Sequence, residues 1–457
     1  MTRPASALVC GGCGWQAPDD EPYPFRCGGA EAGDDIDHVL ARVLDLARLT
    51  FPKGTLEDDP FIAYRHLSHA YHLALAHGLT DEAYVDLVSS LDDAVRRVDG
   101  AGFVTTLFAR QDALGERLGF RSPGGVWVKD ETSNVSGSHK GRHLMGLMIY
   151  LKVIERVGLG RPGVPRLAIA SCGNAALAAA VVASAGGFPL DVFVPVDAER
   201  SVVGRLHDLH ANVVVCPREA GVPGDPTYAR LWAAIAEGAL PFTCQGNVNG
   251  LAIEGGETLG YEIASATAGQ GVVLDRLFVQ VGGGALASAC VQSLGEARAL
   301  GALPSEPRIH TVQTRGVFPL KRAFDLLRER EPVGGSEPAG VSGRGAWYEE
   351  RLRYATQHRS EFMWPWEEAP GSVAGGILDD ETYDWFAVVR GMVATAGDAH
   401  VVDEGTLIEA NALAVETTGI DVDPTGSAGL AGLIDAVRTG VVQPDETVCV
   451  LFTGTRR

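Results

Sequence analysis

The feature that most restricts the fold is an alternation of short apolar runs with helical patterns, which begins at residue 126. The apolar runs are rich in β-branched and aromatic residues, as strands are. They read VWVKDE, LAIAS, DVFVPV, NVVVCP, PFTCQG, RLFVQVG and IHTVQT, and a last one, TVCVLFTG, lies near the C-terminus. Helical spacing between them covers residues 139–157, 174–186, 199–209, 227–238, 253–265, 284–299 and 317–331. The alternation predicts βαβ units, and therefore a parallel sheet covered by helices.

Three other segments lack this alternation. Residues 1–34 hold three cysteines among glycines and prolines. Residues 35–118 are predicted to be helical, because HVLARVLDLARL, FIAYRHLSHAYHLALAHGL and EAYVDLVSSLDDAVRRV space their apolar residues three and four apart. Asp81 is the predicted N-cap of the third helix. Residues 332–375 are rich in Gly, Pro, Trp and charge and are predicted to form a long loop or insertion.

Length and composition limit the classes of function. A chain of 457 residues with 46% hydrophobic and 21% charged residues is typical of a folded enzyme rather than of a disordered protein. Its net charge of −20 argues against nucleic acid or an anionic membrane as the main partner. It has no apolar run long enough to span a membrane and no secretory signal pattern, and most of its eight cysteines show no paired spacing. These features predict a cytoplasmic protein.

Four polar or glycine-rich segments follow predicted strands, where parallel sheets bind their ligands. They are Lys129–Lys140, Ser171–Ala176, Gly282–Leu286 and Phe452–Gly454. Three glycines that open a helix leave backbone N–H groups free for a phosphate at the positive end of the helix dipole. A lysine at a helix start feels the same field, which disfavours its charged form and suits it to hold an aldehyde as a Schiff base.

Each segment alone has an ordinary alternative. Gly282–Ala287 also matches the Gly-x-Gly-x-x-Ala fingerprint of an NAD-dependent dehydrogenase, although the next predicted strand lacks the acidic residue expected at its end. Ser171 and Asn174 could cap a helix, and Lys140 could be a solvated charge in a non-catalytic amino-acid-binding protein. The occurrence of all four segments at the same kind of junction favours one shared ligand site.

Together the segments resemble the fold type II pyridoxal-phosphate enzymes, and most of all the threonine synthase branch of the tryptophan synthase β-like superfamily. The resemblance covers residues 126–457 and the Cys-rich start. It is carried by Ser136-Gly-Ser-His-Lys140-Gly-Arg142, Ser171-Cys-Gly-Asn-Ala-Ala176, Glu254-Gly-Gly-Glu-Thr258, Gly282-Gly-Gly-Ala-Leu286, Asp423-Pro-Thr-Gly-Ser-Ala428 and Phe452-Thr-Gly454.

The resemblance implies a two-lobed α/β fold with parallel or mixed sheets wrapped by helices. We expect a Cys-rich, degenerate zinc-ribbon-like segment at 1–34 and a helical N-terminal extension at 35–118. A large domain that binds pyridoxal phosphate is expected at 119–150 and 245–457. A small mobile domain, which carries the asparagine loop, is expected at 151–244. The resemblance also implies a homodimer and a small-molecule amino-acid substrate.

The resemblance further implies a role for each site residue. Lys140 holds pyridoxal 5'-phosphate as a Schiff base and then acts as general base and acid. Asn174 bonds the ring oxygen of the cofactor, and the Thr453 hydroxyl meets the pyridine nitrogen. The implied cofactor-binding residues are Lys140, Asn174, Gly282, Gly283, Gly284, Ala285, Leu286 and Thr453. The implied substrate-binding residues are Ser138, His139, Ser171 and Gly173.

A neutral hydroxyl does not keep the ring nitrogen protonated as a carboxylate does, so the ring is a weaker electron sink. This favours loss of a β or γ leaving group over transamination. The expected enzyme is therefore a lyase that acts on a hydroxy- or O-phosphorylated amino acid by elimination or replacement. A serine/threonine ammonia-lyase and a β-replacement synthase stay open as alternatives. Threonine synthases usually carry Phe before the lysine and Asp after it, whereas this chain has His139 and Gly141, and a His-Lys pair resembles the tryptophan synthase β-subunit.

Two groups of residues suggest a metal. Cys10, Cys13 and Cys27 resemble half of a zinc ribbon, but Gly28, Gly29 and Ala30 supply no fourth ligand, a place that His38 could take. Either zinc binds there or the segment is a degenerate ribbon packed on the main domain. His66, His69 and His72 recur every three residues and are interpreted as an exposed polar helix face, because no carboxylate that would orient them is in view.

Overall fold

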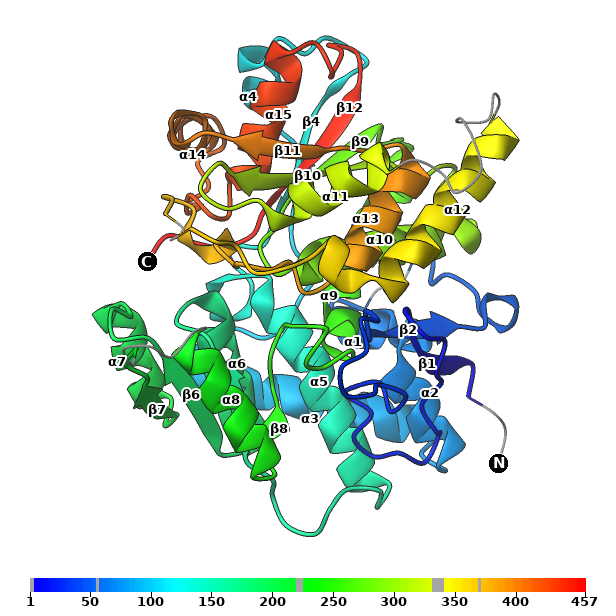
Figure 1. Cartoon of the computed structure of the whole chain (residues 1–457), viewed down its shortest axis with the longest axis vertical. Coiled ribbons are helices and arrows are strands. Elements are labelled where there is room, and N and C mark those ends of the chain that lie inside the picture. The colour runs from blue at the N-terminus through cyan, green and yellow to red at the C-terminus, as the bar shows by residue number, and fades with distance from the viewer. Residues whose placement is uncertain (1–3, 55–56, 219–224, 331–340, 369–370) are drawn as a thin grey trace.

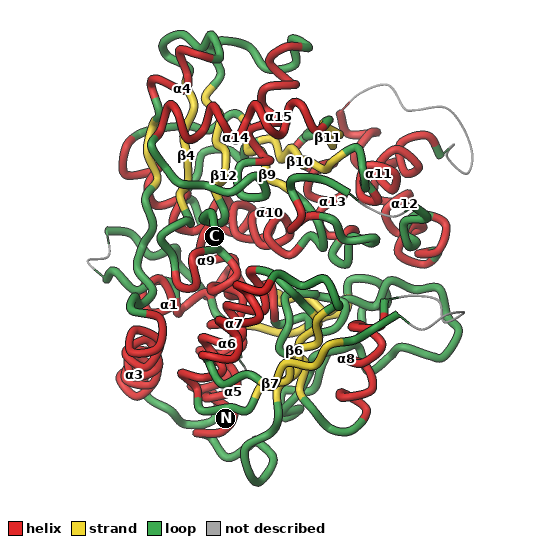
Figure 2. The backbone as a smooth tube through the Cα atoms, turned by 90° about the vertical axis from the view of Figure 1, so that its left-hand side faces the viewer, coloured by secondary structure: helices red, strands yellow, loops and turns green. Residues whose placement is uncertain are grey.

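The structure is a computed structural model, which describes residues 4–54, 57–218, 225–330, 341–368 and 371–457. It contains a six-stranded sheet, in the upper part of Figure 1, and a four-stranded sheet in the lower part. Figure 2 shows helices on both sides of these strands. The predicted α/β fold with parallel or mixed sheets is confirmed.

The larger sheet has the strand order β11-β10-β9-β12-β4-β3. Its pairs are parallel except for β3–β4, which is antiparallel. Phe452 pairs with Asp130 and Val450 with Phe278, so the carboxyl ends of β4, β9 and β12 lie at one edge of the sheet. The strands are β3 (Phe108–Arg110), β4 (Gly125–Asp130), β9 (Arg276–Gln280), β10 (Arg308–Thr314), β11 (Ala399–Val402) and β12 (Thr447–Phe452).

The smaller sheet is parallel throughout, with the order β7-β6-β5-β8. Its strands are β5 (Leu167–Ala170), β6 (Leu190–Val194), β7 (Asn212–Val215) and β8 (Leu240–Pro241). The strands of the larger sheet come before and after this stretch of chain. The domain boundaries given above stay a prediction.

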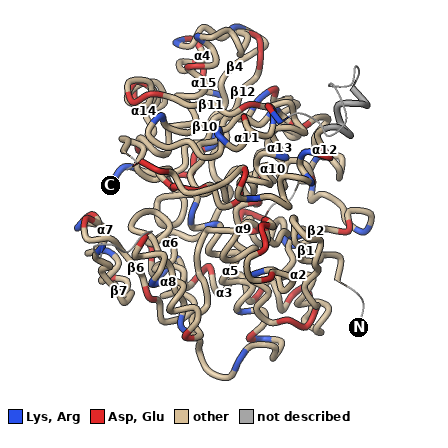
Figure 3. Tube along the Cα trace, viewed as in Figure 1, with Lys and Arg blue, Asp and Glu red and all other residues tan. Residues whose placement is uncertain are grey.

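Helices follow the strands and cover both sheets. All seven helices predicted between strands are present. The helices from residue 112 onward are α4 (Asp112–Arg117), α5 (Lys140–Arg156), α6 (Asn174–Gly186), α7 (Arg200–Asp208), α8 (Pro226–Ala236), α9 (Ala252–Gln270), α10 (Ala285–Ala299), α11 (Pro319–Glu329), α12 (Val341–Gln357), α13 (Trp385–Thr395), α14 (Glu404–Thr418) and α15 (Ala428–Arg438). No described helix is both long and apolar enough to cross a membrane. Figure 3 shows acidic and basic residues interspersed along the chain.

Helix α12 corrects the prediction of a long loop over 332–375. Its Leu352 and Ala355 are buried in the same apolar core as Trp385 of α13. Tertiary packing stabilises this helix although its local composition suggested a loop. Residues 332–340 and 369–370 of the predicted loop lie outside the described residues.

The predicted helical extension is wrong in its first part. Residues 38–49 form strand β2 (Leu40–Leu44) and a short 3-10 helix, η1 (Leu46–Arg48). Leu40, Arg42 and Leu44 are buried in alternation, and β2 pairs antiparallel with β1 (Ser6–Cys10). Over five residues a strand and a helix can place apolar side chains similarly, and pairing with β1 decides between them.

The rest of the extension is helical over residues 60–99 but more broken than predicted, and its last part is wrong, because residues 108–110 form strand β3 of the six-stranded sheet. It contains α1 (Pro60–Ala63), η2 (Arg65–Leu67), α2 (His69–Ala76) and α3 (Asp81–Asp99). The N-cap of α3 is Thr80, whose Oγ1 accepts a hydrogen bond from the Ala83 amide at 3.1 Å. Asp81, the predicted cap, is instead paired with Arg65 at 2.7 Å.

The histidines of this extension do not form an exposed face. His66 is exposed, but His69 and His72 are buried, with 7% and 9% of their surface exposed. His69 Nδ1 lies 2.9 Å from Ser6 Oγ, and His72 Nε2 lies 2.9 Å from the His66 carbonyl oxygen. Burial lowers the pKa of both His69 and His72 to about 4, so they are neutral structural groups.

Candidate active site

Lys140 is the first residue of α5, and a buried ion cluster fixes this end of the helix. Arg142, one position beyond the neighbouring glycine, is 0% exposed. Its Nε lies 2.7 Å from Glu131 Oε2, just after β4, and its Nη1 lies 2.5 Å from Glu262 Oε1 on α9. Burial alone would raise the pKa of Glu131, but the charge and hydrogen bonds of the Arg142 guanidinium act in the opposite direction, and that pKa is lowered to about 2. The cluster therefore joins the lysine's helix to a strand and to a second helix.

The start of α9 packs directly against α5. A Cβ on Gly255 would lie 2.0 Å from the Arg142 carbonyl oxygen, so no larger residue fits there. Thr258 Oγ1 accepts a hydrogen bond from Arg142 Nη1 at 3.0 Å. Glu254 accepts bonds from Ser68 Oγ at 2.6 Å and from the His69 amide at 2.7 Å. The motif Glu254–Thr258 thus positions the helix that begins with the lysine.

Thr453, the residue after β12, lies beside the lysine and is buried. The His139 amide donates to the Thr453 carbonyl oxygen at 3.0 Å. Gln280 Nε2, at the end of β9, lies 2.7 Å from the Gly426 carbonyl oxygen and 2.7 Å from Thr453 Oγ1. A carbonyl oxygen can only accept, so Gly426 fixes which end of the Gln280 amide faces these groups. The Thr453 hydroxyl therefore accepts from Gln280, and its own hydrogen is free for another acceptor.

The glycine loop Gly282–Gly284 connects β9 to α10. Gly284 has φ of 97° in the left-handed region, which favours glycine. No side chain caps α10, so the amides of its first turn, which include Ala285 and Leu286, are available to an anion. The chain at Asp379–Asp384 packs against the loop, because Thr382 Oγ1 donates to the Gly282 carbonyl oxygen at 2.9 Å.

Asn174 begins α6, the helix after β5, and reaches the end of the last strand. A Cβ on Gly454 would lie 2.8 Å from Asn174 Nδ2. Arg457 Nε donates to Asn174 Oδ1 at 3.0 Å, which leaves Nδ2 as a donor toward the site. Ser171 Oγ accepts from the Gly173 amide at 3.4 Å, and no side chain caps α6. The helix-capping alternative for Ser171 and Asn174 therefore does not hold.

A comparison with protein families identifies the ligand expected at these four strand-to-helix segments. The family described as pyridoxal-phosphate dependent enzyme matches residues 101–454. The chain belongs to this family. The dehydrogenase interpretation of Gly282–Ala287 is thereby replaced by the pyridoxal-phosphate interpretation, and the resemblance seen in the sequence is confirmed.

Known members of the pyridoxal-phosphate family resemble the chain over most of its length. A threonine synthase of Methanosarcina acetivorans is 25% identical over 75% of this chain and 72% of that protein. A cysteate synthase of Methanosphaerula palustris is 26% identical over 76% of this chain and 74% of that protein. Among solved structures, the processed form of threonine deaminase isoform 2 from Solanum lycopersicum aligns with a TM-score of 0.57 and 14% identity, over 83% of this chain and 91% of that one. That structure shows the shared fold.

The junction residues fit pyridoxal phosphate on structural grounds. The uncapped start of α10 offers amides to a phosphate, and the Thr453 hydroxyl has a hydrogen to donate. Ser138 is 0% exposed, and its Oγ has no hydrogen-bond partner among the described residues. Buried polar atoms without partners are rare, so this hydroxyl beside Lys140 is where a bound ligand would supply one.

The charges near Lys140 form part of the same site. Burial raises the pKa of Asp379 to about 6 and that of Asp384 to about 7, although the Lys140 cation acts in the opposite direction. Burial, together with the charges of Lys140 and His143, lowers the pKa of His139 well below its usual value. The lysine therefore has around it two carboxyl groups whose pKa values are raised toward neutral pH and an imidazole that is neutral.

The sequence had not marked several of these neighbours. Gln280 is a polar residue inside the apolar run RLFVQV, directly before the glycine loop, and that position was a usable signal. Asp379 and Asp384 follow the segment predicted as a loop, and no strand junction precedes them, so no pattern pointed to them. The predicted metal ligands Cys10, Cys13 and Cys27 belong to a separate cluster. It lies in the N-terminal ribbon, which is strands β1 and β2 with the loop between them, residues 6–44.

Proposed function

We propose that this pyridoxal-phosphate enzyme uses Lys140 as its Schiff-base lysine and acts on a hydroxy- or O-phosphorylated amino acid by β- or γ-elimination or replacement, as threonine synthase-like lyases do. The observation that carries the proposal is the orientation of the Thr453 hydroxyl. Gln280 donates to its oxygen at 2.7 Å, so the hydroxyl presents its hydrogen to the site.

That orientation favours elimination. When bound, pyridoxal phosphate supplies an electron sink for negative charge at the Cα of an amino acid. Thr453 offers a neutral donor where other enzymes offer a carboxylate, so it does not hold a proton on the ring nitrogen. The sink is then weaker, and loss of a β or γ leaving group is favoured over transamination.

Lys140 is the proposed general base and acid. Its amine, at the start of α5, would take the proton from Cα and return it at the end of the reaction. The Arg142 cluster with Glu131 and Glu262 holds the helix while the lysine side chain moves. His139 stays neutral, because burial and the charges of Lys140 and His143 lower its pKa. Its Nδ1 lies 3.2 Å from the Thr453 carbonyl oxygen and donates to it, which fixes the orientation of the ring.

The remaining junctions are proposed to bind the charged ends of the ligands. The start of α10, with Gly282–Leu286, would hold the cofactor phosphate through backbone amides. Asn174 Nδ2 would donate to the ring oxygen. The substrate carboxylate would lie at Ser171 and the uncapped amides of α6. Ser138 and His139 are also proposed to contact the substrate.

A replacement reaction is the second candidate. It is supported by similarity to both a threonine synthase and a cysteate synthase at nearly equal identity. His139 and Gly141, which flank the lysine, differ from the usual threonine synthase pattern, and this difference supports a different substrate side chain.

A substrate screen tests the proposal. The holoenzyme would be incubated with O-phosphohomoserine, O-phosphoserine, threonine and serine, each with and without sulfite or sulfide. Phosphate, ammonia, 2-oxo acid and new amino acids would be measured. We expect one substrate to yield phosphate or ammonia, and the Lys140→Ala variant to yield none. No product from any combination, from enzyme that carries the cofactor, would overturn the assignment.

We further propose that the enzyme is a homodimer in the cytoplasm. The location is supported by eight free cysteines, and the dimer by the family resemblance alone. Light scattering coupled to gel filtration would give the mass in solution, and the mass of a single chain would contradict the dimer.

A further inference from the structure

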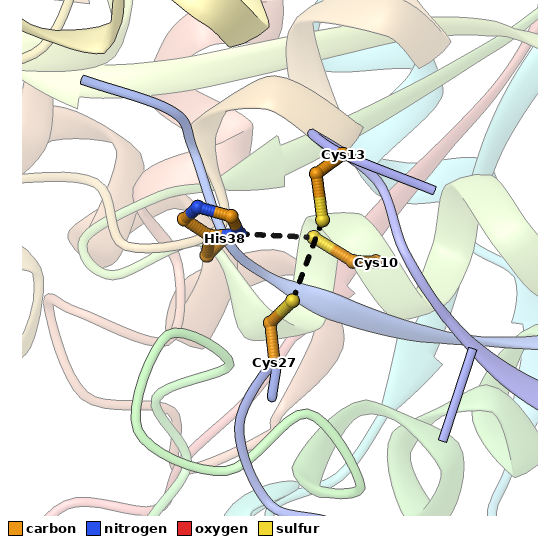
Figure 4. A group of neighbouring side chains, drawn as sticks. All are labelled: Cys10, Cys13, Cys27 and His38. Atoms are coloured by element: carbon orange, nitrogen blue, oxygen red, sulfur yellow. Dashed lines mark hydrogen bonds between the residues drawn. The ribbon is translucent and has the colours of Figure 1, made fainter. Parts of the chain in front are cut away.

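The N-terminal ribbon holds a second cluster of chemistry-bearing side chains, separate from the site around Lys140. Cys10 ends β1, Cys13 lies in the turn that follows, and His38 lies just before β2. Cys27 comes from the loop between the two strands. One sulfur or nitrogen atom from each residue lies within 4.8 Å of all the others. Figure 4 shows the four side chains directed toward one another.

The spacing of these atoms matches the ligand shell of zinc. Cys13 and Cys27 place their sulfurs 3.5 Å apart, and Cys10 Sγ lies 3.5 Å from His38 Nδ1. In a tetrahedral site with Zn–S bonds of about 2.3 Å, two sulfurs lie about 3.8 Å apart. Three sulfurs and one imidazole complete four ligands, as in structural zinc sites.

The orientation of His38 supports ligation. Its Nε2 lies 3.0 Å from Asp34 Oδ2 and donates to that carboxylate. The hydrogen is therefore on Nε2, and the lone pair of Nδ1 faces the sulfur of Cys10. A carboxylate behind the histidine is the usual way in which metal-binding imidazoles are oriented.

Glycines allow the ligand loops to approach one another. A Cβ on Gly12 would lie 2.4 Å from the Asp37 carbonyl oxygen, and one on Gly28 would lie 2.6 Å from the Trp15 ring. The Gly29 amide donates to Cys27 Sγ at 3.3 Å, a bond that stabilises a thiolate. The glycines that supply no ligand thus serve to close the cluster.

We propose that Cys10, Cys13, Cys27 and His38 bind a structural Zn²⁺ ion that fastens the N-terminal ribbon to the rest of the enzyme. The thiols of the three cysteines lose their protons to solvent on binding, and no electron is transferred. This inference does not rest on the proposed reaction.

The contacts beside His38 show what the ion would fasten. The Asp37 amide donates to the Thr356 carbonyl oxygen at 2.8 Å, and the Asp37 carboxylate lies 3.2 Å from Arg359 Nε. Arg359 also pairs with Glu381. Glu381 lies just before Thr382, which bonds to the glycine loop of the active site. Zinc would therefore hold the ribbon against the segment that packs on that loop.

Metal content tests the proposal. Full-length, tag-free enzyme would be purified without added metal, and zinc per chain would be measured by mass spectrometry of the elements. We expect about one zinc per chain in the native enzyme and in the control His77→Ala, whose histidine lies outside the cluster. We expect at least a fivefold loss of zinc in Cys27→Ser and His38→Ala.

Measurements on the unmodified enzyme keep the test valid if the cysteine or histidine variants do not fold. A thiol-blocking reagent should release zinc to a colorimetric chelator, and cobalt in its place should give the visible absorption of a tetrahedral thiolate site. Three results would overturn the proposal: native enzyme that takes up no zinc when zinc is supplied, a Cys13–Cys27 disulfide in peptides mapped without reductant, or full zinc content in His38→Ala. Because zinc and cofactor are measured separately, failure here is distinguishable from failure of the proposed reaction.

Discussion

The active site and the N-terminal zinc cluster are assembled in opposite ways. The active site combines residues as far apart in sequence as Lys140 and Thr453, and strand pairing in the six-stranded sheet brings them together. The cluster takes its ligands from the short stretch 10–38, and its local apolar core consists of Cys10, Cys27 and Leu40 with Trp15 beside them. A site built on paired strands keeps its geometry without a ligand, whereas most ligands of the cluster lie on loops that an ion would tie together.

The largest expected effect is a loss of catalytic activity without a loss of the fold. Lys140→Ala should lower kcat/KM by about 10³-fold or more and remove the visible absorption of the bound cofactor. The fold should persist, because the Arg142 cluster still holds α5. Activity, absorption and thermal unfolding would be measured together. Lys152→Ala is the matched control and should keep full activity, because Lys152 lies in the same helix and contacts Glu155 and the Phe188 ring, which are not part of the active site.

The second effect is on the scaffold of the active site. Arg142→Met removes the guanidinium that Glu131 and Glu262 share. It leaves Glu131 buried without a paired cation and Glu262 with Lys129 alone, and it should cost about 3–5 kcal/mol of unfolding free energy. The exposed pair of Arg438 with Glu409 offers the control, since Arg438→Met should cost at most about 1 kcal/mol. Urea unfolding would give both values. Equal losses of unfolding free energy in the two variants would show that the buried ion cluster does not stabilise the active-site scaffold.

Removal of zinc should separate the two regions. After treatment with a chelator, the backbone amides of Cys10 and Gly14, which are bonded within the ligand loops, should exchange much faster, because the ion would tie these loops together. Amides of the β4–β12 pairing should keep their protection, because that sheet does not depend on the ion. Hydrogen-exchange mass spectrometry resolves the two. An equal increase in the exchange rate in both regions would contradict the proposed difference between them.

The smallest expected effect concerns Gln280, a positioning residue that acts through Thr453. Gln280→Met removes the bond that orients the hydroxyl, which is worth about 1 kcal/mol, so kcat should fall by about tenfold or less. The ¹⁵N resonance of labelled pyridoxal phosphate should also shift in Gln280→Met, a change that lost stability alone does not produce. Gln443→Met, at an exposed glutamine, should leave both unchanged. An unaltered ¹⁵N signal in Gln280→Met would show that Gln280 does not position the Thr453 hydroxyl against the cofactor.

Much of the fold and most of the active site could be predicted from local patterns. Each βα unit carries its own periodicity, and each ligand loop follows a strand, so Lys140, Asn174, Gly282 and Thr453 could be identified from short motifs. Strand pairing then places them together by a general rule of parallel sheets.

What the sequence did not reveal depends on contacts between distant segments. Strand β2 needs β1 as its partner, and α12 needs α11 and α13 to pack against. His69 is buried because it meets Ser6 of β1. Asp384 enters the active site only because the chain after α12 folds back over the glycine loop, where the Asp384 amide donates to the Gly283 carbonyl oxygen at 3.0 Å. None of these contacts leaves a local periodicity.

The attachment point of the cofactor is the most direct test of the central claim, that the junctions around Lys140 form one pyridoxal-phosphate site. Enzyme loaded with pyridoxal phosphate would be reduced with borohydride, digested and mapped by mass spectrometry. We predict that the phosphopyridoxyl group will be found on the peptide that contains Lys140, and that the Lys140→Ala variant will carry none at that peptide. Stoichiometric labelling of another lysine, or no labelling of enzyme given the cofactor, would contradict the account.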